Sequence, residues 1–401
     1  MINFTKLLGG TPSISQALKD VSKKGQSKLF KACNASSPLV VFNITRRCNL
    51  DCLHCYLESK NKKYTGELSL EQIKSTIDSL ENINIPILLL SGGEPLVHKN
   101  IFEIIEYAKN KGIRVGLSTN GTLITKAVAK KLKQTKIDYV GVSIDGARKL
   151  HDKFRNLNGA YNLAIKGIRN SQQAGLKTGV RFTISKVNAP DLPAVLDMCV
   201  KEKIRRFCMY HLVYTGRGED LVSLDMDNIQ RRQVIDFLIQ RVLEYKKKKV
   251  DLEILSVDNH ADGIHIYNYL KKDNPKAAKE VLKLLKFHGG CSAGSKIVDI
   301  SPTGDVFACQ FWQHETLGNV KITEFNKIWL NQKNKQLCKL RCKADYLKGK
   351  CGRCKYKAYC GGCRIRAEVV YSDPWQEDPC CYLTEEEIKN KKLKKLNKLI
   401  Q

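Results

Sequence analysis

Three cysteines, Cys48, Cys52 and Cys55, follow one another with the spacing C-x3-C-x2-C. A structural zinc ion or a closed iron–sulfur cluster takes four protein ligands. Three thiolates at this spacing therefore predict a cubane cluster that keeps one iron open for another ligand. Three unrelated buried cysteines are the alternative, but His54 before the third cysteine and an apolar strand before the first favour a cluster loop.

A second group of cysteines lies in the C-terminal third, where eight of the 16 cysteines fall between Cys338 and Cys381. In a chain without an apparent secretion signal, such a group favours metal ligation over disulfides. A structural zinc ribbon formed by residues 351–363 is an alternative to an iron–sulfur site. The cysteines that lie in apolar or helical surroundings are expected to be small core residues: Cys33, Cys199 and Cys208.

Composition narrows the class of protein. The 401 residues are 42% hydrophobic, and no apolar run approaches the ~20 residues that span a bilayer. The first residues also lack the apolar core of a secretion signal. We therefore expect a cytoplasmic protein that is not bound to a membrane.

The formal net charge of +29 attracts anions, either a small polyanion or nucleic acid. Solvated surface lysines without a specific partner are the alternative. Nucleic acid is disfavoured because no basic stretch is interleaved with stacking aromatics.

Strand and helix patterns alternate between residues 39 and 246. We expect strands at 39–44, 87–90, 115–118, 139–144, 180–184 and 207–213, with helices at 69–80, 101–111, 125–134, 161–174, 192–203 and 229–246. Ser69 and Gln72 form a capping-box signature at the first helix. Six such units predict a parallel sheet with right-handed crossovers, and are too few for a closed eight-unit barrel.

The domain organisation expected from these patterns has four parts. Residues 1–38 form an N-terminal extension with one or two short helices, and 39–254 form the α/β domain. Residues 255–383 form a cysteine-rich domain with little hydrophobic core, and 384–401 form a Lys-rich amphipathic helix.

Polar residues and glycines follow three of the expected strands. They are Gly92, Gly93 and Glu94 after the second, Ser118 and Asn120 at the end of the third, and Ser143 and Asp145 at the end of the fourth. Chemistry in such sheets lies at the carboxyl ends of strands, although ordinary turns use the same residue types. Arg181 on the fifth strand is either a clamp for a carboxylate or a structural ion-pair partner.

The cysteine loop, the Gly92-Gly93-Glu94-Pro95 run and the strand–helix alternation together resemble the radical S-adenosylmethionine (SAM) enzymes. The resemblance implies a partial (β/α)6 barrel, and a [4Fe-4S] cluster whose open iron binds the methionine end of S-adenosylmethionine. It also implies that Gly92, Gly93 and Glu94 bind the cofactor's amine, and that Arg181 is a candidate for its carboxylate. The ribose and methionine side would be lined by Ser118, Asn120, Ser143 and Asp145.

The C-terminal cysteines resemble the SPASM-type auxiliary domain that follows many radical SAM enzymes. The resemblance implies one or two auxiliary iron–sulfur clusters. One would be held by Cys351, Cys354, Cys360 and a cysteine of the 380–381 pair, with Cys380 as the working assignment. Another would be held by Cys291, Cys309 and Cys363, spaced around Gly304. A fourth ligand for it is not evident, so that cluster is either open or completed by Cys338, Cys342 or the remaining cysteine of the pair.

Longer stretches narrow the resemblance to the radical enzymes of the siroheme-dependent haem and haem d1 routes: residues 39–56, 210–218, 257–263, 310–312, 317–320, 360–367 and 378–383. This implies removal of two acetate side chains from didecarboxysiroheme to give iron-coproporphyrin III. The alternatives are the haem d1 reaction that oxidises two ring positions, decarboxylation of propionates, and a peptide maturase. A non-catalytic cluster-bearing scaffold or electron carrier is disfavoured, because it has no use for an intact Gly92-Gly93-Glu94-Pro95 run.

The implied partners are an anionic iron tetrapyrrole and a low-potential electron donor, flavodoxin or ferredoxin. Arg217, Arg364 and Arg366 are candidates for the substrate's carboxylates. An imidazole could bind the substrate's iron, with His211 and His260 favoured over His288 and His314. A lone histidine is more often a hydrogen-bonded structural residue.

Overall fold

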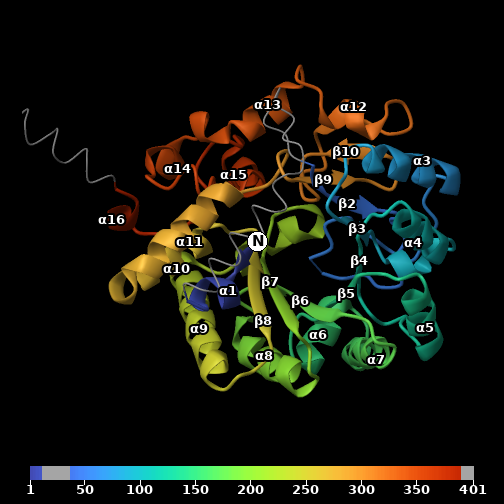
Figure 1. Ribbon diagram of the computed structural model, residues 1–401, viewed down its shortest axis with the longest axis horizontal. Coiled ribbons are helices and arrows are strands. Elements are labelled where there is room, and N and C mark those ends of the chain that lie inside the picture. The colour runs from blue at the N-terminus through green and yellow to red at the C-terminus, as the bar shows by residue number, and fades with distance from the viewer. Residues whose placement is uncertain (11–36, 390–401) are drawn as a thin grey trace, which may run out of the picture.

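A single sheet of eleven strands forms the centre of the protein, in the order β1-β8-β7-β6-β5-β4-β3-β2-β9-β10-β11 (Figure 1). The computed structural model describes residues 1–10 and 37–389. Strands β2 to β8 are parallel and neighbours in chain order. They are β2 (Leu39–Asn43), β3 (Leu88–Ser91), β4 (Val115–Thr119), β5 (Tyr139–Ser143), β6 (Thr178–Ile184), β7 (Arg206–His211) and β8 (Glu253–Val257).

Helices surround the outer side of this sheet (Figure 1). The strands are rich in Val, Leu and Ile because both of their faces are covered, as expected for parallel strands. Ser69 caps the first outer helix with the predicted capping box. The outer helices are α3 (Leu70–Glu81), α4 (Ile101–Asn110), α5 (Lys126–Gln134), α6 (Arg148–Arg155), α7 (Ala160–Gln173), α8 (Leu192–Lys201) and α9 (Asn228–Lys247).

The barrel contains one more strand than the six predicted. Strand β8 pairs in parallel with β7, and the domain boundary expected between residues 254 and 255 falls inside it. Two further helices follow, α10 (Ala261–Asp273) and α11 (Pro275–His288), where the pattern had indicated irregular chain. Five residues of strand after a lysine run give too little alternation to be recognised from sequence.

The two edges of the sheet do not meet, so the barrel is partial, as predicted. At one edge β1 (Ile2–Asn3) pairs antiparallel with β8, and α1 (Phe4–Leu8) buries Phe4, Leu7 and Leu8. At the other edge β9 (Ile297–Ile300) runs parallel to β2, and β10 (Asp305–Phe307) and β11 (Thr316–Asn319) continue antiparallel.

The cysteine-rich region packs on the barrel and shares its hydrophobic core. Phe325, Trp329 and Tyr382 belong to the same buried cluster as the barrel strands. The helices here are short: α12 (Phe325–Trp329), α13 (Lys335–Arg341), α14 (Gly349–Arg353), α15 (Arg364–Tyr371) and α16 (Glu385–Ile388), with the 3-10 turn η4 (Lys343–Asp345). Three further 3-10 turns lie in the barrel: η1 (Pro95–Val97), η2 (Ala189–Asp191) and η3 (Gly216–Leu224).

Some expectations fall outside the described ranges. The predicted C-terminal helix is described only as α16, because residues 390–401 lie beyond them. The core role expected for Cys33 also lies outside them, whereas Cys199 and Cys208 are buried as predicted. None of the helices within residues 1–10 and 37–389 is long and apolar enough to cross a membrane.

Candidate active site and auxiliary cluster sites

A cavity lies at the carboxyl ends of the parallel strands. The three thiols of Cys48, Cys52 and Cys55 line it together. The structure brings several other predicted residues to the same wall: Gly92, Gly93, Ser118, Asn120, Ser143, Arg181 and His211. The sulfurs therefore face the space in which strand-end groups meet, which fits a [4Fe-4S] cluster open toward a ligand.

The Gly92–Gly93 turn is fixed against the start of the cysteine loop. The Gly93 N–H donates to the Thr45 carbonyl at 2.8 Å, and the Glu94 N–H donates to the Arg47 carbonyl at 2.9 Å. A Cβ on Gly93 would lie 2.3 Å from the Arg47 oxygen, and one on Gly92 would lie 2.4 Å from the Thr45 oxygen. Both glycines are thus required for this close approach, apart from any ligand contact.

Glu94 does not face the cavity, which corrects the role expected from the motif. Its carboxylate accepts hydrogen bonds from the Leu96 N–H at 3.0 Å, the Asn120 N–H at 2.8 Å and the Thr119 hydroxyl at 2.8 Å. The side chain is completely buried, and burial raises its pKa to about 7. Glu94 instead fixes η1 to the end of β4, and Ser91, Gly92 and Gly93 are the residues of this turn that line the cavity.

Asp145 also acts indirectly, because its buried carboxylate is paired with Arg155 and accepts from the Thr183 N–H at 3.2 Å. Arg155 donates from Nη1 to the Cys52 sulfur at 3.5 Å and lines the cavity. The cation opposes the effect of burial, which raises the pKa of the Cys52 thiol. Sequence reasoning missed Arg155, since the α6 segment is short and mostly charged.

His151 is held neutral beneath this pair. Its ring is 1% exposed, and Nδ1 accepts a hydrogen bond from the Asp145 N–H at 3.0 Å. Protonation of Nδ1 would break that bond, and burial lowers the pKa of His151 to about 4.

The pKa of His151 gives stability a specific pH dependence. Between pH 6.5 and about 4 the unfolded chain binds a proton that the folded state refuses, so the free energy of unfolding falls as pH falls. We expect this contribution to approach 1.4 kcal/mol per pH unit at most, and to be missing in His151→Asn. Urea unfolding of the wild-type protein and the variant at pH 7, 6 and 5 gives this dependence. If the free energy of unfolding changed with pH equally in both proteins, the assignment to His151 would be wrong.

Arg181 is a cavity-lining cation. It donates to the Ser118 hydroxyl, and its guanidinium carbon lies 4.8 Å from the centre of the Tyr210 ring. Among the described residues no carboxylate forms an ion pair with it. The structure therefore leaves its charge available for an anionic group of a ligand, rather than for the ion pair considered from sequence.

Asn120 ties the end of β4 to the cysteine loop. Its amide donates to the Asn49 side chain at 2.9 Å and approaches the Cys48 sulfur at 3.9 Å. Ser143 lines the cavity at the end of β5.

A separate small cavity is lined by four cysteines: Cys351, Cys354, Cys360 and Cys381. Four cysteines around one space fit a closed cluster. Cys380, the working assignment from sequence, lies elsewhere, with its sulfur 3.3 Å from the Tyr214 hydroxyl and 3.5 Å from the Asp225 carboxylate. The two neighbouring cysteines thus lie in different surroundings, and Cys381 rather than Cys380 lines the cavity with the other three.

The pair offers a direct comparison. We expect Cys381→Ala to lose the iron of one cluster per chain after anaerobic reconstitution, because only that sulfur faces the other three. Cys380→Ala should keep it and lose only core packing. Iron content and electron paramagnetic resonance spectra are measured for both variants. Loss of iron in Cys380→Ala and its retention in Cys381→Ala would instead identify Cys380 as the ligand.

The remaining predicted ligands are Cys291, Cys309 and Cys363. The pKa of the Cys309 thiol is raised mainly by burial, then by the nearby charge of Asp258, and then by Cys291 and Cys363. The Cys291 N–H donates to the Cys360 carbonyl at 2.9 Å, so the two auxiliary groups are joined through the backbone. Cys338 donates to the Gln332 carbonyl at 3.1 Å, and Cys342 is exposed. These surroundings do not identify Cys338 or Cys342 as a ligand of the second auxiliary cluster.

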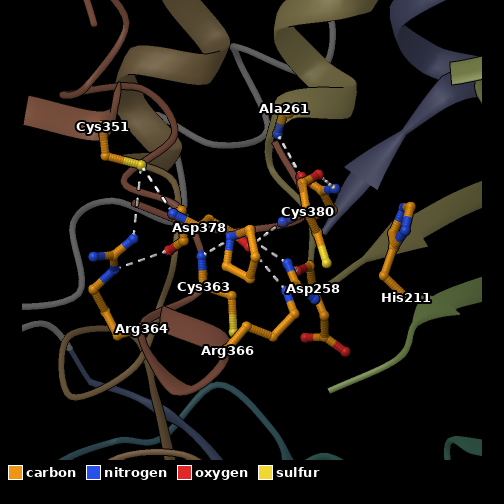
Figure 2. A network of polar contacts seen from close by, with 12 residues as sticks. His211, Asp258, Ala261, Cys351, Cys363, Arg364, Arg366, Asp378 and Cys380 are labelled. Atoms are coloured by element: carbon orange, nitrogen blue, oxygen red, sulfur yellow. Dashed lines mark hydrogen bonds and ion pairs between the residues drawn. The ribbon is translucent and has the colours of Figure 1, made fainter. Parts of the chain in front are cut away.

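Three arginines expected to bind substrate have structural roles instead. Arg217 donates to the Cys52 carbonyl at 2.8 Å and pairs with Asp51 at 3.1 Å, which holds the cysteine loop. Arg364 and Arg366 are completely buried, and Figure 2 shows their guanidinium groups inside a polar network. Arg364 donates to the carbonyls of residues 374 and 376, at 2.8 and 2.7 Å.

The histidines differ in how they are placed. His211 is buried at the end of β7, lines the large cavity and contacts Asp262 through Nε2 at 2.9 Å. His260 is half-buried, and burial lowers its pKa. His288 ends α11, and burial lowers its pKa to about 4. His314 is mostly exposed and pairs with Glu368 at 3.1 Å.

The open barrel, the three-cysteine wall and the second cysteine region define a radical SAM enzyme with an auxiliary iron–sulfur domain. Residues 42–199 match the radical SAM superfamily, and residues 291–355 match SPASM, an iron–sulfur cluster-binding domain. The chain belongs to this superfamily. The SPASM match also favours iron–sulfur ligation over the zinc ribbon.

The similarity extends to particular relatives. The chain is 44% identical to the Fe-coproporphyrin III synthase of Methanosarcina barkeri, over 97% of this chain and 99% of that protein. It is 39% identical to the pre-heme d1 synthase of Dinoroseobacter shibae, over 86% of each.

Solved structures with the same fold are more distant in sequence. Streptococcus suis SuiB bound to S-adenosylmethionine is 18% identical, with a TM-score of 0.69 over 92% of this chain and 82% of that one. Native anSMEcpe with bound AdoMet is 20% identical, with a TM-score of 0.66 over 90% and 99%. These likenesses support the fold alone.

Proposed function

We propose that this protein removes two acetate side chains from didecarboxysiroheme and forms iron-coproporphyrin III. The observation that carries the proposal is the 44% identity, over nearly the whole chain, to a protein that makes Fe-coproporphyrin III. The cavity agrees with it, because Cys48, Cys52 and Cys55 share one wall with strand-end groups and with the cation of Arg181. The tetrapyrrole itself is a flat ring that bears several carboxylates.

Cys48, Cys52 and Cys55 would hold the [4Fe-4S] cluster, which together with S-adenosylmethionine would supply radical chemistry in this cavity. The protein's own residues hold the reacting groups in place. Arg155 and Arg217 fix the loop through the Cys52 sulfur and carbonyl, and Asn120 fixes it through Asn49. Such fixed positioning holds the cysteine loop in one geometry relative to the cavity.

Charge supports an anionic substrate. Arg181 lines the cavity without a carboxylate partner among the described residues, and Arg155 lines it beside Cys52. A guanidinium can bind a carboxylate through two hydrogen bonds. We assign Arg181 to a carboxylate of S-adenosylmethionine or of the tetrapyrrole.

The proposal includes a flavodoxin or ferredoxin as low-potential electron donor, because the reaction consumes electrons that the chain does not itself generate. It also includes a cytoplasmic location, where such donors and reduced cysteines occur. The net charge of +29 would favour the approach of an acidic donor.

Anaerobic turnover tests the substrate. The protein is reconstituted with iron and sulfide, then supplied with S-adenosylmethionine, a strong reductant and didecarboxysiroheme. Mass spectrometry should show loss of both acetate groups. A product with two new oxo groups would instead assign the activity of the pre-heme d1 branch, which the 39% identity makes the second candidate.

A further inference from the structure

Two arginines line the large cavity, and their charges are balanced differently. Arg155 forms an ion pair with Asp145 and donates to the Cys52 sulfur at 3.5 Å, so it is tied to the cysteine loop. Arg181 is partly buried and has no carboxylate partner among the described residues. A cation held in the interior without a counter-charge is costly unless an anion binds to it.

The strand pattern directs Arg181 into the cavity. Arg181 and Thr183 on β6 line the cavity, whereas Val180 and Phe182 on either side of Arg181 pack in the hydrophobic core. Successive side chains of a strand point to opposite faces of the sheet. Gly141 on β5 leaves room for the stem of the arginine, because a Cβ at this glycine would lie 3.1 Å from Cδ of Arg181.

The guanidinium of Arg181 is held with one edge open. Its Nη1 donates to the Ser118 hydroxyl, and its carbon lies 4.8 Å from the centre of the Tyr210 ring, a favourable position for a cation. Nε and Nη2 have no acceptor among the described residues, and neither is a fully buried atom. This edge presents two parallel N–H groups, which is the arrangement that binds both oxygens of a carboxylate.

Aromatic and apolar side chains surround this edge of the cavity. Tyr56, Tyr210 and Phe311 line it, together with Leu212 and Val213, and the rings of Tyr56 and Phe311 lie 5.6 Å apart. A flat conjugated ring packs well against such side chains. The methionine end of S-adenosylmethionine would instead lie at the open iron beside the cysteine loop, where Arg155 is the nearer cation.

From the open edge, the missing counter-charge and the aromatic lining, we propose that Arg181 binds a carboxylate of the tetrapyrrole through Nε and Nη2. The inference rests on the proposed function and names the residue that orients the substrate's ring. The carboxylate belongs either to an acetate that leaves or to a propionate that stays in the product. These two sources have the same chemistry, and affinity for the product distinguishes them.

The test compares four full-length proteins after anaerobic reconstitution: wild type, Arg181→Met, Arg181→Lys and Arg205→Met. Arg205 is exposed and pairs with Asp251 at 3.2 Å on the surface, so its variant changes the net charge by the same amount as Arg181→Met. Equilibrium dialysis gives the dissociation constants of didecarboxysiroheme and of iron-coproporphyrin III. The affinity for S-adenosylmethionine and the iron content are measured on the same samples.

We expect Arg181→Met to raise the dissociation constant of didecarboxysiroheme roughly 10- to 100-fold, as for the loss of hydrogen bonds between charged groups. Arg181→Lys should have a smaller effect of the same sign, because an ammonium keeps the charge but lacks the two parallel N–H groups. Weaker binding of both tetrapyrroles would assign Arg181 to a propionate, and weaker binding of didecarboxysiroheme alone would assign it to an acetate.

Equal tetrapyrrole affinity in wild type and both Arg181 variants would overturn the inference and leave the proposed function standing. An equal loss in Arg205→Met would overturn it too, since the effect would then be one of net charge. Loss of affinity for S-adenosylmethionine in a variant of full iron content would assign Arg181 to the methionine carboxylate instead. If Arg181→Met fails to retain iron, Arg181→Lys decides the question. Wild type that binds neither tetrapyrrole would contradict the proposed function as well.

Discussion

Cys52→Ala is expected to abolish formation of 5′-deoxyadenosine and to remove the iron of one cluster per chain. The three thiols of the cysteine loop face one cavity, and no other described cysteine lines it. The two thiolates that remain, those of Cys48 and Cys55, are too few to hold a [4Fe-4S] cluster that has only three protein ligands to begin with. The substitution also removes the sulfur to which Arg155 donates, whereas the bond from Arg217 to the backbone carbonyl of residue 52 remains.

The matched control is Cys199→Ala. Cys199 is completely buried on α8 within the hydrophobic core and lines neither of the two cavities that the other cysteines line. The Cys199→Ala protein should keep its full iron content and activity. Its free energy of unfolding should fall by about 1 kcal/mol, as for a small truncation in the core. Equal iron content in both variants would show that Cys52 is not a ligand.

Gly93→Ala is expected to have the second-largest effect, through geometry rather than ligation. The added Cβ would lie 2.3 Å from the Arg47 oxygen and 2.5 Å from the Arg46 oxygen, and backbone cannot withdraw as a flexible side chain can. Overpacking of this kind costs about 1–3 kcal/mol or more. The movement must displace the start of the cysteine loop, so cluster assembly should fail while the auxiliary clusters remain.

Gly112→Ala provides the comparison for this variant. Gly112 has a positive φ of +73°, which Gly93 does not, but a Cβ on Gly112 would meet nothing within 4 Å. Gly112→Ala should lower the free energy of unfolding by about 1–2 kcal/mol through the backbone conformation alone, and it should leave the clusters intact. Iron content and 5′-deoxyadenosine yield separate the two variants, and a Gly93→Ala protein with both at normal level would refute the close-packing argument.

The parallel sheet and the cysteine loop could be predicted because each leaves a local pattern. Apolar runs alternate with capped helices, and the C-x3-C-x2-C spacing is distinctive. Strand β8 was missed, since five residues after a lysine run carry little periodicity. Arg155 was missed for a different reason: α6 reads Arg-Lys-Leu-His-Asp-Lys-Phe-Arg, and the Cys52 that Arg155 contacts lies 103 residues away in the sequence.

The direction of side chains was harder to predict than their position. Glu94 stands in the expected turn, but backbone N–H groups of Leu96 and Asn120 occupy its carboxylate. Adjacent residues Cys380 and Cys381 are equivalent by spacing and differ only in what tertiary packing places around them. Arg366 was assigned to substrate because of its charge, whereas burial and Asp378 make it structural.

The central claim is that radical chemistry in the cavity of Cys48, Cys52 and Cys55 releases acetate from a tetrapyrrole. Its most direct test is the stoichiometry of turnover with didecarboxysiroheme labelled with ¹³C in the acetate side chains. Labelled acetate, 5′-deoxyadenosine and iron-coproporphyrin III are counted in the same reaction. The account predicts two labelled acetates and two 5′-deoxyadenosines for each product molecule. 5′-Deoxyadenosine with all label retained on the tetrapyrrole would contradict it.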